Sequence, residues 1–201
     1  MATLITRRSF LRTFIFTGLA MSMTPLGAKT PPAYTINSAF NAKNILTVYY
    51  SHTGNTGYIA KYINQTTGGD IVQLQIVNPY PDIHRDFTEQ VRRELDSGYK
   101  PPLKVQPASI ADYDPLFVGS PCWRGTIATP VITFLSSYDF SGKTIIPFMT
   151  HEGSGMGRSE EHIRQLCPKA TVLEGLAIRG RRAVLSSKEV ESWLNCLAIQ
   201  L

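Results

Sequence analysis

Hydrophobic and polar residues follow two distinct periods along residues 44–201. Short apolar runs, some of them alternating with polar residues, predict β-strands at residues 45–50, 71–77, 116–119, 143–149 and 171–177. Apolar residues spaced by three and four predict helices at residues 56–65, 84–95, 159–166 and 187–201, and Pro130 opens one more. Strands that alternate with helices in this way predict a single α/β domain, whose parallel sheet is covered by helices on both faces.

Three positions add detail to this pattern. Pro147 lies inside the fourth predicted strand and, because proline donates no ladder hydrogen bond, it predicts a sheet edge or a bulge. Trp193 falls on the apolar face of the last helix and is expected in the core. Gly57 lies early in the first helix, where glycine costs about 1 kcal/mol relative to alanine. We expect that it lets a phosphate approach the backbone.

The first residues of the chain differ in character from the rest. Residues 1–28 combine Arg7 and Arg8, an apolar run at 14–23 and small residues at the end, which is the order of a signal peptide. The adjacent arginines resemble the twin-arginine export signal, so we expect export to the periplasm by that route. The apolar run is about half of the ~20 residues that cross a bilayer as a helix, and we expect no permanent membrane anchor. Residues 29–43 predict a linker; a disordered basic tail is the alternative for the N-terminus.

Basic residues are concentrated near the N-terminus. The formal net charge is +5, but residues 1–28 contain three arginines and no acid, which leaves 17 basic and 15 acidic side chains. A remaining cluster of Arg179, Arg181 and Arg182 is interpreted as a solvated loop, so we expect no nucleic-acid partner. The spacing of the histidines and cysteines fits no metal site.

Parallel sheets of this kind bind ligands beyond the carboxyl ends of their strands, where the strand order reverses. The loop after the first strand consists of Ser51, His52, Thr53, Gly54, Asn55 and Thr56. It leads into a helix whose first N–H groups and positive dipole end form an anion site. Because the loop lacks a lysine and the pattern of nucleotide hydrolases, it favours a phosphate that is held and not transferred. A polar loop that merely caps the helix is the alternative.

Two further loops follow the third and fourth predicted strands. The second loop consists of Ser120, Pro121, Cys122, Trp123, Arg124 and Gly125. The third consists of Thr150, His151, Glu152, Gly153, Ser154 and Gly155. All three loops are candidate ligand-binding segments, because the fold brings the carboxyl ends of the strands to one edge of the sheet.

The first loop resembles the FMN-phosphate loop of the flavodoxin family, and the other two match that family in order and spacing. The resemblance covers about residues 44–200. It implies a flavodoxin-like three-layer sandwich with a five-stranded parallel sheet in the order 2-1-3-4-5. It also implies that residues 44–201 form an FMN-binding domain, with FMN as the cofactor and the three loops as its binding residues.

The resemblance implies roles for single residues. Trp123 holds the position from which an aromatic residue stacks on the flavin ring, with a core tryptophan as the alternative. Glycines in the third loop suit backbone amides that bond the flavin's pyrimidine edge; a plain flexible loop is the alternative. His151 near the ring would stabilise a negatively charged reduced flavin when protonated, unless it is simply exposed. Cys122 is interpreted as a half-buried thiol, with a redox role as the alternative, and Cys167 and Cys196 form a candidate pair.

The main expectation is therefore a flavodoxin-like redox protein that carries electrons between partners outside the cytoplasm. One alternative is an FMN-dependent reductase of quinones or similar small acceptors. Another is a flavin-free binding module with the same fold. The expected partner is a redox protein or a membrane quinone, and a strongly basic partner is disfavoured by a chain that is near neutral without its first residues.

Overall fold

The computed structural model describes residues 44–198. The predicted export signal at 1–28, the predicted linker at 29–43 and the end of the last predicted helix lie outside the described residues. The sheet is parallel through the order β2 (Asp70–Gln73), β1 (Leu46–Tyr49), β5 (Leu116–Trp123) and β7 (Thr144–His151), beyond which lie β8 (Thr171–Val172) and β9 (Leu176–Arg179). This arrangement confirms the predicted 2-1-3-4-5 order, with the fifth strand in two pieces.

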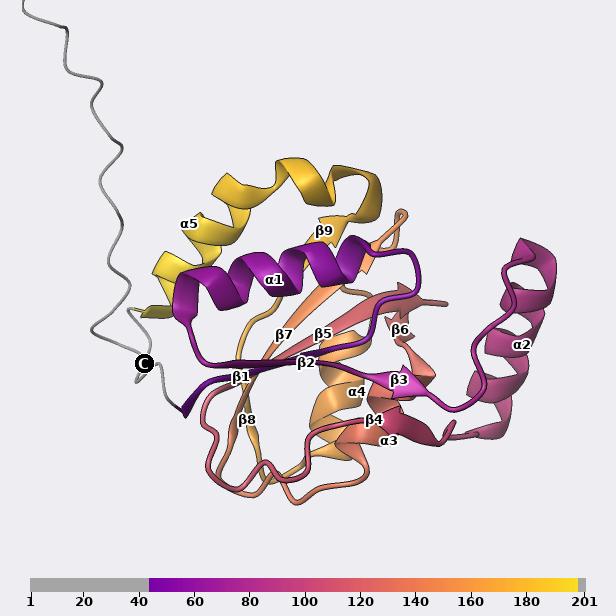
Figure 1. Cartoon of the computed structure of the whole chain (residues 1–201), viewed down its shortest axis with the longest axis horizontal. Helices are drawn as coiled ribbons and strands as arrows, with labels where there is room; N and C mark the ends of the chain where they lie inside the picture. Colours follow the sequence, from indigo (N-terminus) through magenta and orange to yellow (C-terminus); the bar gives the residue numbers. More distant parts are fainter. Residues whose placement is uncertain (1–43, 199–201) are drawn as a thin grey trace, which may run out of the picture. The chain divides into compact units, whose positions relative to one another are not determined.

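Helices cover the sheet in two outer layers, as Figure 1 shows. One face carries α1 (Asn55–Thr67) and α5 (Ser187–Ala198), and the other carries α3 (Thr129–Leu135) and α4 (Ser159–Leu166). Helix α2 (His84–Ser97) packs beside α3, at the right of Figure 1. The predicted three-layer sandwich is confirmed.

Alternation along the central strands divides the core in two. Phe117 and Phe148 face α1 and α5, whereas their neighbours Val118 and Met149 face α3 and α4. Trp193 packs against the first of these cores, with its ring centroid 6.0 Å from that of Phe117, but stays partly exposed. It is a core-edge residue and contributes nothing to the candidate site.

The reason for Gly57 lies in packing. A Cβ atom at this position would be 3.2 Å from Cε2 of Tyr49 and 3.7 Å from Cβ of Ser51. The first contact is tighter than usual, so a side chain here would require the Tyr49 ring to move slightly. The glycine therefore allows the first helix to approach the sheet closely, which accounts for its unfavourable helix propensity without a ligand.

The expectation that Pro147 marks an edge or bulge of its own strand is wrong, because β7 is an interior strand. Pro147 is opposite Val118 of β5 in an unbroken parallel register. The irregularity occurs instead in the neighbouring strand, which is divided between Val172, the partner of Ile145, and Leu176, the partner of Phe148. Proline has no N–H group to donate to a neighbouring strand. The break between β8 and β9 lies beside Pro147, so no strand residue there is left without a hydrogen-bond donor.

Several short elements have no counterpart in the predicted pattern. Residues 71–77 divide into β2 and a short strand, β3 (Gln75–Ile76), which pairs with β4 (Leu103–Val105) in a separate antiparallel ribbon. Strand β6 (Thr126–Ile127) turns back on β5, and a 3₁₀ helix, η2 (Gly180–Leu185), precedes α5. Within residues 44–198, none of the helices has the length and apolar character that a membrane crossing requires.

Candidate cofactor site

The three candidate loops meet at a cavity of about 400 Å³ at the carboxyl edge of the sheet. Its volume is within the range of small-molecule and cofactor pockets. The lining residues that the sequence predicted are His52, Thr53, Asn55, Pro121, Cys122, Trp123, Thr150, His151 and Glu152. Four further residues, Asp82, His84, Phe87 and Gly180, complete the wall.

The first loop contains a positive-φ glycine that immediately precedes α1. Gly54 has a φ of 89° at the N-cap position, where the left-handed conformation favours glycine. Within the described part of the chain, no side chain caps this helix start. Its first N–H groups and dipole are therefore available to an anion beside Thr53 and Asn55, which line the cavity.

Ser51 and Thr56, at the two ends of this loop, do not line the cavity. Oγ of Ser51 is buried and has no hydrogen-bond partner in the structure of residues 44–198. The hydroxyl of Thr56 lies 2.7 Å from that of Thr150, and both residues are buried. Thr56 thus joins the first loop to the third, and Ser51 has an unused polar atom next to His52, which lines the cavity.

The second loop divides between the pocket and a hairpin. Pro121, Cys122 and Trp123 line the cavity. Arg124 and Gly125, with φ values of 49° and 80°, form the two-residue connection between β5 and β6. Positive φ at both positions is what a type I′ hairpin turn requires. These two residues do not line the cavity, and the sequence pattern gave no sign of the hairpin.

Ser120 has a structural role. Its Oγ accepts a hydrogen bond from the N–H of Ala128 at 2.8 Å and lies 2.9 Å from the carbonyl oxygen of Pro121, to which it donates. Both bonds hold the chain as it enters and leaves the β5–β6 hairpin. Ser120 is fully buried and does not line the cavity.

An aromatic cluster forms one wall of the cavity. Trp123, only 8% exposed, makes edge-to-face contacts with Tyr50, Tyr80 and Phe87 at centroid distances of 5.1–5.6 Å. His52 stacks on Phe87, with centroids 4.4 Å apart and planes only 4° from parallel. Much of the Trp123 ring is therefore in contact with the protein's own aromatic residues, and its stacking on a ligand stays a prediction.

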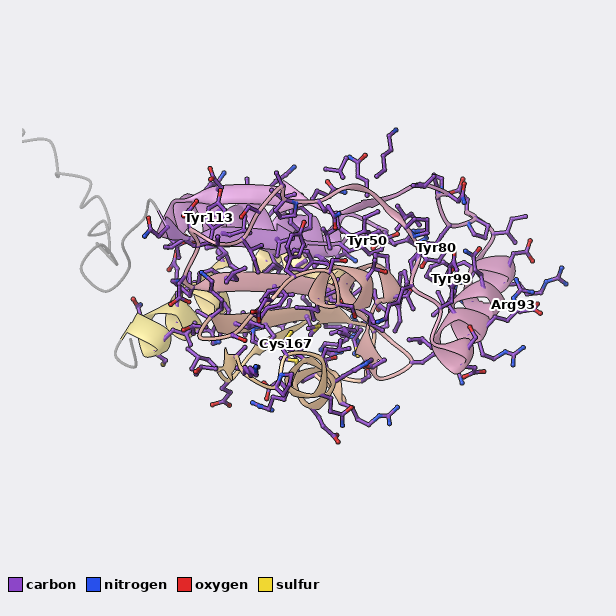
Figure 2. The ribbon with its side chains drawn as sticks, turned by 90° about the horizontal axis from the view of Figure 1, so that it is seen from below. Tyr50, Tyr80, Arg93, Tyr99, Tyr113 and Cys167 are labelled. Carbon is purple, nitrogen blue, oxygen red and sulfur yellow. The ribbon has the colours of Figure 1, made fainter. Side chains whose placement is uncertain are left out.

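A buried carboxylate is hydrogen-bonded to one tyrosine of this cluster. Glu94 is 6% exposed and accepts hydrogen bonds from the hydroxyls of Tyr80 and Thr129, at 2.5 and 2.6 Å, and from Nε2 of Gln90 at 2.9 Å. Figure 2 shows Tyr80 between Tyr50 and helix α2. Burial, followed by Glu94, raises the pKa of both tyrosines well above its usual value. Both phenols are therefore neutral near pH 7.

The third loop contributes three of its six predicted residues. Thr150, His151 and Glu152 line the cavity, whereas Gly153, Ser154 and Gly155 do not. His151 is half-buried, and its Nδ1 atom is buried without a partner among the described residues, so the alternative of a simply exposed histidine is wrong. Ser154 lies outside the cavity and donates a hydrogen bond to Sγ of Cys122 at 3.2 Å.

Gly180 belongs to the site because of what surrounds it. A Cβ atom there would lie 2.7 Å from both Nδ2 of Asn55 and Oε1 of Glu152. The first loop, the third loop and η2 therefore meet at this point. Sequence gave a partial signal for Phe87, which lies on the apolar stripe of a predicted helix, and none for Gly180.

The three cysteines are free thiols, so the candidate pair of Cys167 and Cys196 does not form. Cys167 is buried near the carbonyl oxygen of Leu135, and Cys196 is exposed on α5. Cys122 is half-buried, as interpreted from the sequence. Burial raises the pKa of Cys167 to about 11. No group of histidine, cysteine and acidic side chains within residues 44–198 is arranged to hold a metal ion.

Comparisons with known proteins agree with this geometry. A family model described as Flavodoxin matches residues 44–197. A protein from Bacteroides eggerthii DSM 20697, classed as a flavoprotein, is 28% identical, with a TM-score of 0.69 over 79% of this chain and 99% of that one. A similar protein from Bacteroides uniformis ATCC 8492 is 27% identical, with a TM-score of 0.68 over 77% and 99%.

A third structure, a flavoprotein from Lactobacillus acidophilus NCFM in complex with FMN, shares the fold. It is 22% identical, with a TM-score of 0.60 over 72% of this chain and 98% of that one. No curated protein sequence matches the chain.

Proposed function

The chain belongs to the flavodoxin family, and from that premise we propose that it binds FMN and carries electrons through it. One observation carries the proposal: of the four buried side-chain atoms without a partner among the described residues, two, Oγ of Ser51 and Nδ1 of His151, belong to the candidate loops. His151 lines the cavity and Ser51 precedes a lining residue. Because a buried polar atom without a partner costs about 1–3 kcal/mol, such atoms point to a missing ligand.

The donor set fits the two ends of FMN. Thr53, Asn55 and the uncapped start of α1 would hold the phosphate through neutral donors and the helix dipole. The aromatic wall, in which His52 stacks on Phe87 and Trp123 packs edge-to-face against both, offers an apolar surface to a flavin ring. Bound FMN supplies one- and two-electron redox chemistry.

The protein's own part would be to bind, orient and exclude water. The aromatic wall shields one side of the cavity, and Thr56 and Thr150 hold the first and third loops at a constant separation. His151 would donate or accept a hydrogen bond at its buried Nδ1 atom. None of these roles needs a large substrate pocket, which favours a carrier.

One observation favours the reductase alternative. Asp82, His84 and His52 line the same cavity, and a simple carrier has no use for three titratable groups at its mouth. A quinone or similar small acceptor takes up protons with its electrons, so proton donors beside it would be productive. Turnover of quinols or nicotinamide donors by the FMN-loaded protein would support this second function.

An absorption spectrum of the purified protein tests the proposal. We expect flavin bands, released on denaturation and identified as FMN, or restored when FMN is added to the unloaded chain. A colourless protein that also fails to bind added FMN would refute both redox functions. A flavin-free binding module would then be the better description.

We further propose that the protein works outside the cytoplasm, supported by the twin-arginine pattern at Arg7 and Arg8. The electron partner would accordingly be a redox protein or a membrane quinone. Cell fractionation of the full chain beside an Arg7→Lys/Arg8→Lys variant tests this. Equal distribution of both proteins would contradict export by this route.

A further inference from the structure

The segment from the end of β9 through η2 presents a basic and aliphatic surface to solvent. We define the rim surface as the exposed residues Arg179, Arg181, Arg182, Val184 and Leu185. Val184 is 60% exposed and Leu185 is 78% exposed, which makes Leu185 the most exposed large hydrophobic residue of the described chain. Gly180 and Ala183 of the same segment are buried.

The helical period of η2 determines which of these side chains lie on the same exposed face. A 3₁₀ helix has three residues per turn, so residues at i and i+3 lie above one another. Burial of Gly180 and Ala183 therefore sets Arg181 above Val184 on one exposed face, and Arg182 above Leu185 on the other. Each exposed face pairs a guanidinium with an aliphatic side chain.

The rim surface borders the candidate cofactor pocket. Gly180 lines the cavity between Arg179 and Arg181, and Arg179 is the register partner of His151, another lining residue. The hydroxyl of Tyr58 in α1 donates to the carbonyl oxygen of Val184 at 3.3 Å, which connects η2 to the helix that begins at the pocket. A partner on this surface would therefore lie next to the bound cofactor.

The positive charge of this surface is uncompensated. Residues 44–198 carry 15 basic and 15 acidic side chains, so the described domain is neutral as a whole. None of the ion pairs found in these residues involves Arg179, Arg181 or Arg182. Glu152, on the pocket wall, lies near Gly180, which is between two of these arginines in sequence, but forms no ion pair with them in the described part of the chain. Interpreting the arginines as an ordinary solvated loop leaves their place at the pocket unexplained.

We propose that the rim surface docks an electron-transfer protein that presents carboxylates around its own redox group. This inference rests on the proposed function. Arginine forks pair with carboxylates in two-point hydrogen bonds, and Val184 and Leu185 supply apolar contact between them. Complementary charge accelerates encounter and sets orientation, which is what brief contacts between electron carriers require.

The pattern favours a protein over a bilayer. A helix that lies in a membrane interface segregates its apolar residues on one face and its cations on the other. In η2, each exposed face mixes the two kinds of side chain. The six residues of η2 also offer only two exposed aliphatic side chains, too few for an interfacial anchor.

Electron transfer to proteins of opposite charge tests the proposal. The FMN-loaded protein is reduced and mixed with oxidised cytochrome b5, an acidic haem protein, or with cytochrome c, a basic one. We expect the bimolecular rate with cytochrome b5 to fall at least about tenfold between about 10 mM and about 500 mM salt. The rate with cytochrome c should stay level or rise.

Charge reversal locates the surface. Arg181→Glu/Arg182→Glu should lower the low-salt rate with cytochrome b5 about tenfold or more. The matched control Lys100→Glu/Lys169→Glu changes net charge equally at exposed positions that do not line the cavity, and should change the rate less than about threefold. Equal losses in both variants, or a salt-independent rate, would overturn the proposal.

Two further measurements separate the other outcomes. Sedimentation with anionic phosphatidylglycerol vesicles that is lost in Arg181→Glu/Arg182→Glu, with an unchanged rate to cytochrome b5, would overturn the protein partner in favour of a membrane. If the chain fails to bind FMN, the proposed function fails first. Calorimetric binding of cytochrome b5 to the unloaded chain then still decides whether the rim surface docks an acidic protein.

Discussion

The hydroxyl oxygens of Thr56 and Thr150 lie 2.7 Å apart, although the two residues are 94 positions apart in sequence. The bond joins the second residue of α1 to the penultimate residue of β7 and is buried from solvent. It is the direct side-chain connection between the first and third loops of the site. The geometry of the first loop therefore depends on that of the third.

Replacement of either threonine by valine should destabilise the protein more than replacement of both. Thr56→Val keeps the volume but leaves the hydroxyl of Thr150 buried and unpaired, at a cost of about 1–3 kcal/mol in the free energy of unfolding. The double variant leaves no unpaired group. Urea unfolding of the four proteins in this double-mutant cycle measures the coupling, and strictly additive losses would contradict the bond.

Ser51 and Thr47 allow a buried hydroxyl next to the cavity to be compared with one in the middle of a strand. Both have a buried Oγ without a partner in the described chain, but Thr47 lies mid-strand in β1, between Leu46 and Val48, away from the loop that reaches the cavity. Ser51→Ala should leave the unloaded protein as stable or slightly more stable, and weaken FMN binding about tenfold, or about 1.4 kcal/mol.

Thr47→Val is the matched control, with the same small effect on stability and FMN affinity within about twofold of the parent. Calorimetric titration with FMN and urea unfolding provide the two measurements. Equal weakening of FMN binding in the two variants would show that Ser51 has no special role at the pocket.

Thiol labelling should report on the pocket without any redox measurement. Exposed Cys196 reacts with iodoacetamide in the folded protein, and Cys167, whose pKa is about 11, is almost unreactive near pH 8. Bound FMN should slow alkylation of Cys122, on the cavity wall, about tenfold or more and leave Cys196 unaffected. Mass spectrometry of the labelled peptides measures each rate, and undiminished labelling of Cys122 would place FMN elsewhere.

Two buried tyrosines should make the protein sensitive to alkali. The pKa of Tyr50 and of Tyr80 is raised by burial and then by Glu94, so the folded state keeps protons that the unfolded chain loses near pH 10. Their contribution to stability is complete below pH 10 and lost as pH rises above it, at about 1.4 kcal/mol per pH unit for each phenol.

Urea unfolding between about pH 9 and about pH 11 measures this slope. Tyr50→Phe should remove one phenol's share of it, whereas Tyr99→Phe, at a half-exposed position, should leave the slope as it is. The same slope in all three proteins would show that the phenol of Tyr50 does not keep its proton on folding.

The apolar runs of the sequence were sufficient to predict the central strands and most helices, whereas the sheet order was implied by the resemblance to the flavodoxin family. Each central strand is buried on both faces, so its run is continuous, and a parallel sheet then requires the helical crossovers that the polar periodicity predicts. The sequence did not predict the antiparallel ribbon of β3 and β4, because two- and three-residue strands produce no period. It predicted an edge or bulge in the strand that contains Pro147, whereas the irregularity lies in the neighbouring strand. Which strands pair is determined by the tertiary structure and cannot be derived from the local pattern.

The sequence predicted the part of the site that lies close to strand ends, but not the part that depends on tertiary packing. Residues at or shortly after the end of a strand, such as His151 and Thr53, were placed correctly at the cavity. Arg124 was assigned to the site, but β5 continues past the sheet edge into a hairpin that turns the residue away from the cavity. Asp82 and His84 were missed because they reach the pocket through the position of α2, which no local pattern specifies.

Helix α2 has one more consequence, for how long a cofactor stays bound. It supplies Phe87 and His84 to the cavity wall, yet only Val91 and Glu94 among its residues are buried. A helix anchored by so few buried residues opens locally at a lower free energy than the sheet unfolds. For the proposed FMN complex, we therefore expect the opening of α2 to set the residence time of FMN, so variants that strengthen the central sheet would raise the stability of the fold and leave cofactor release as fast as before.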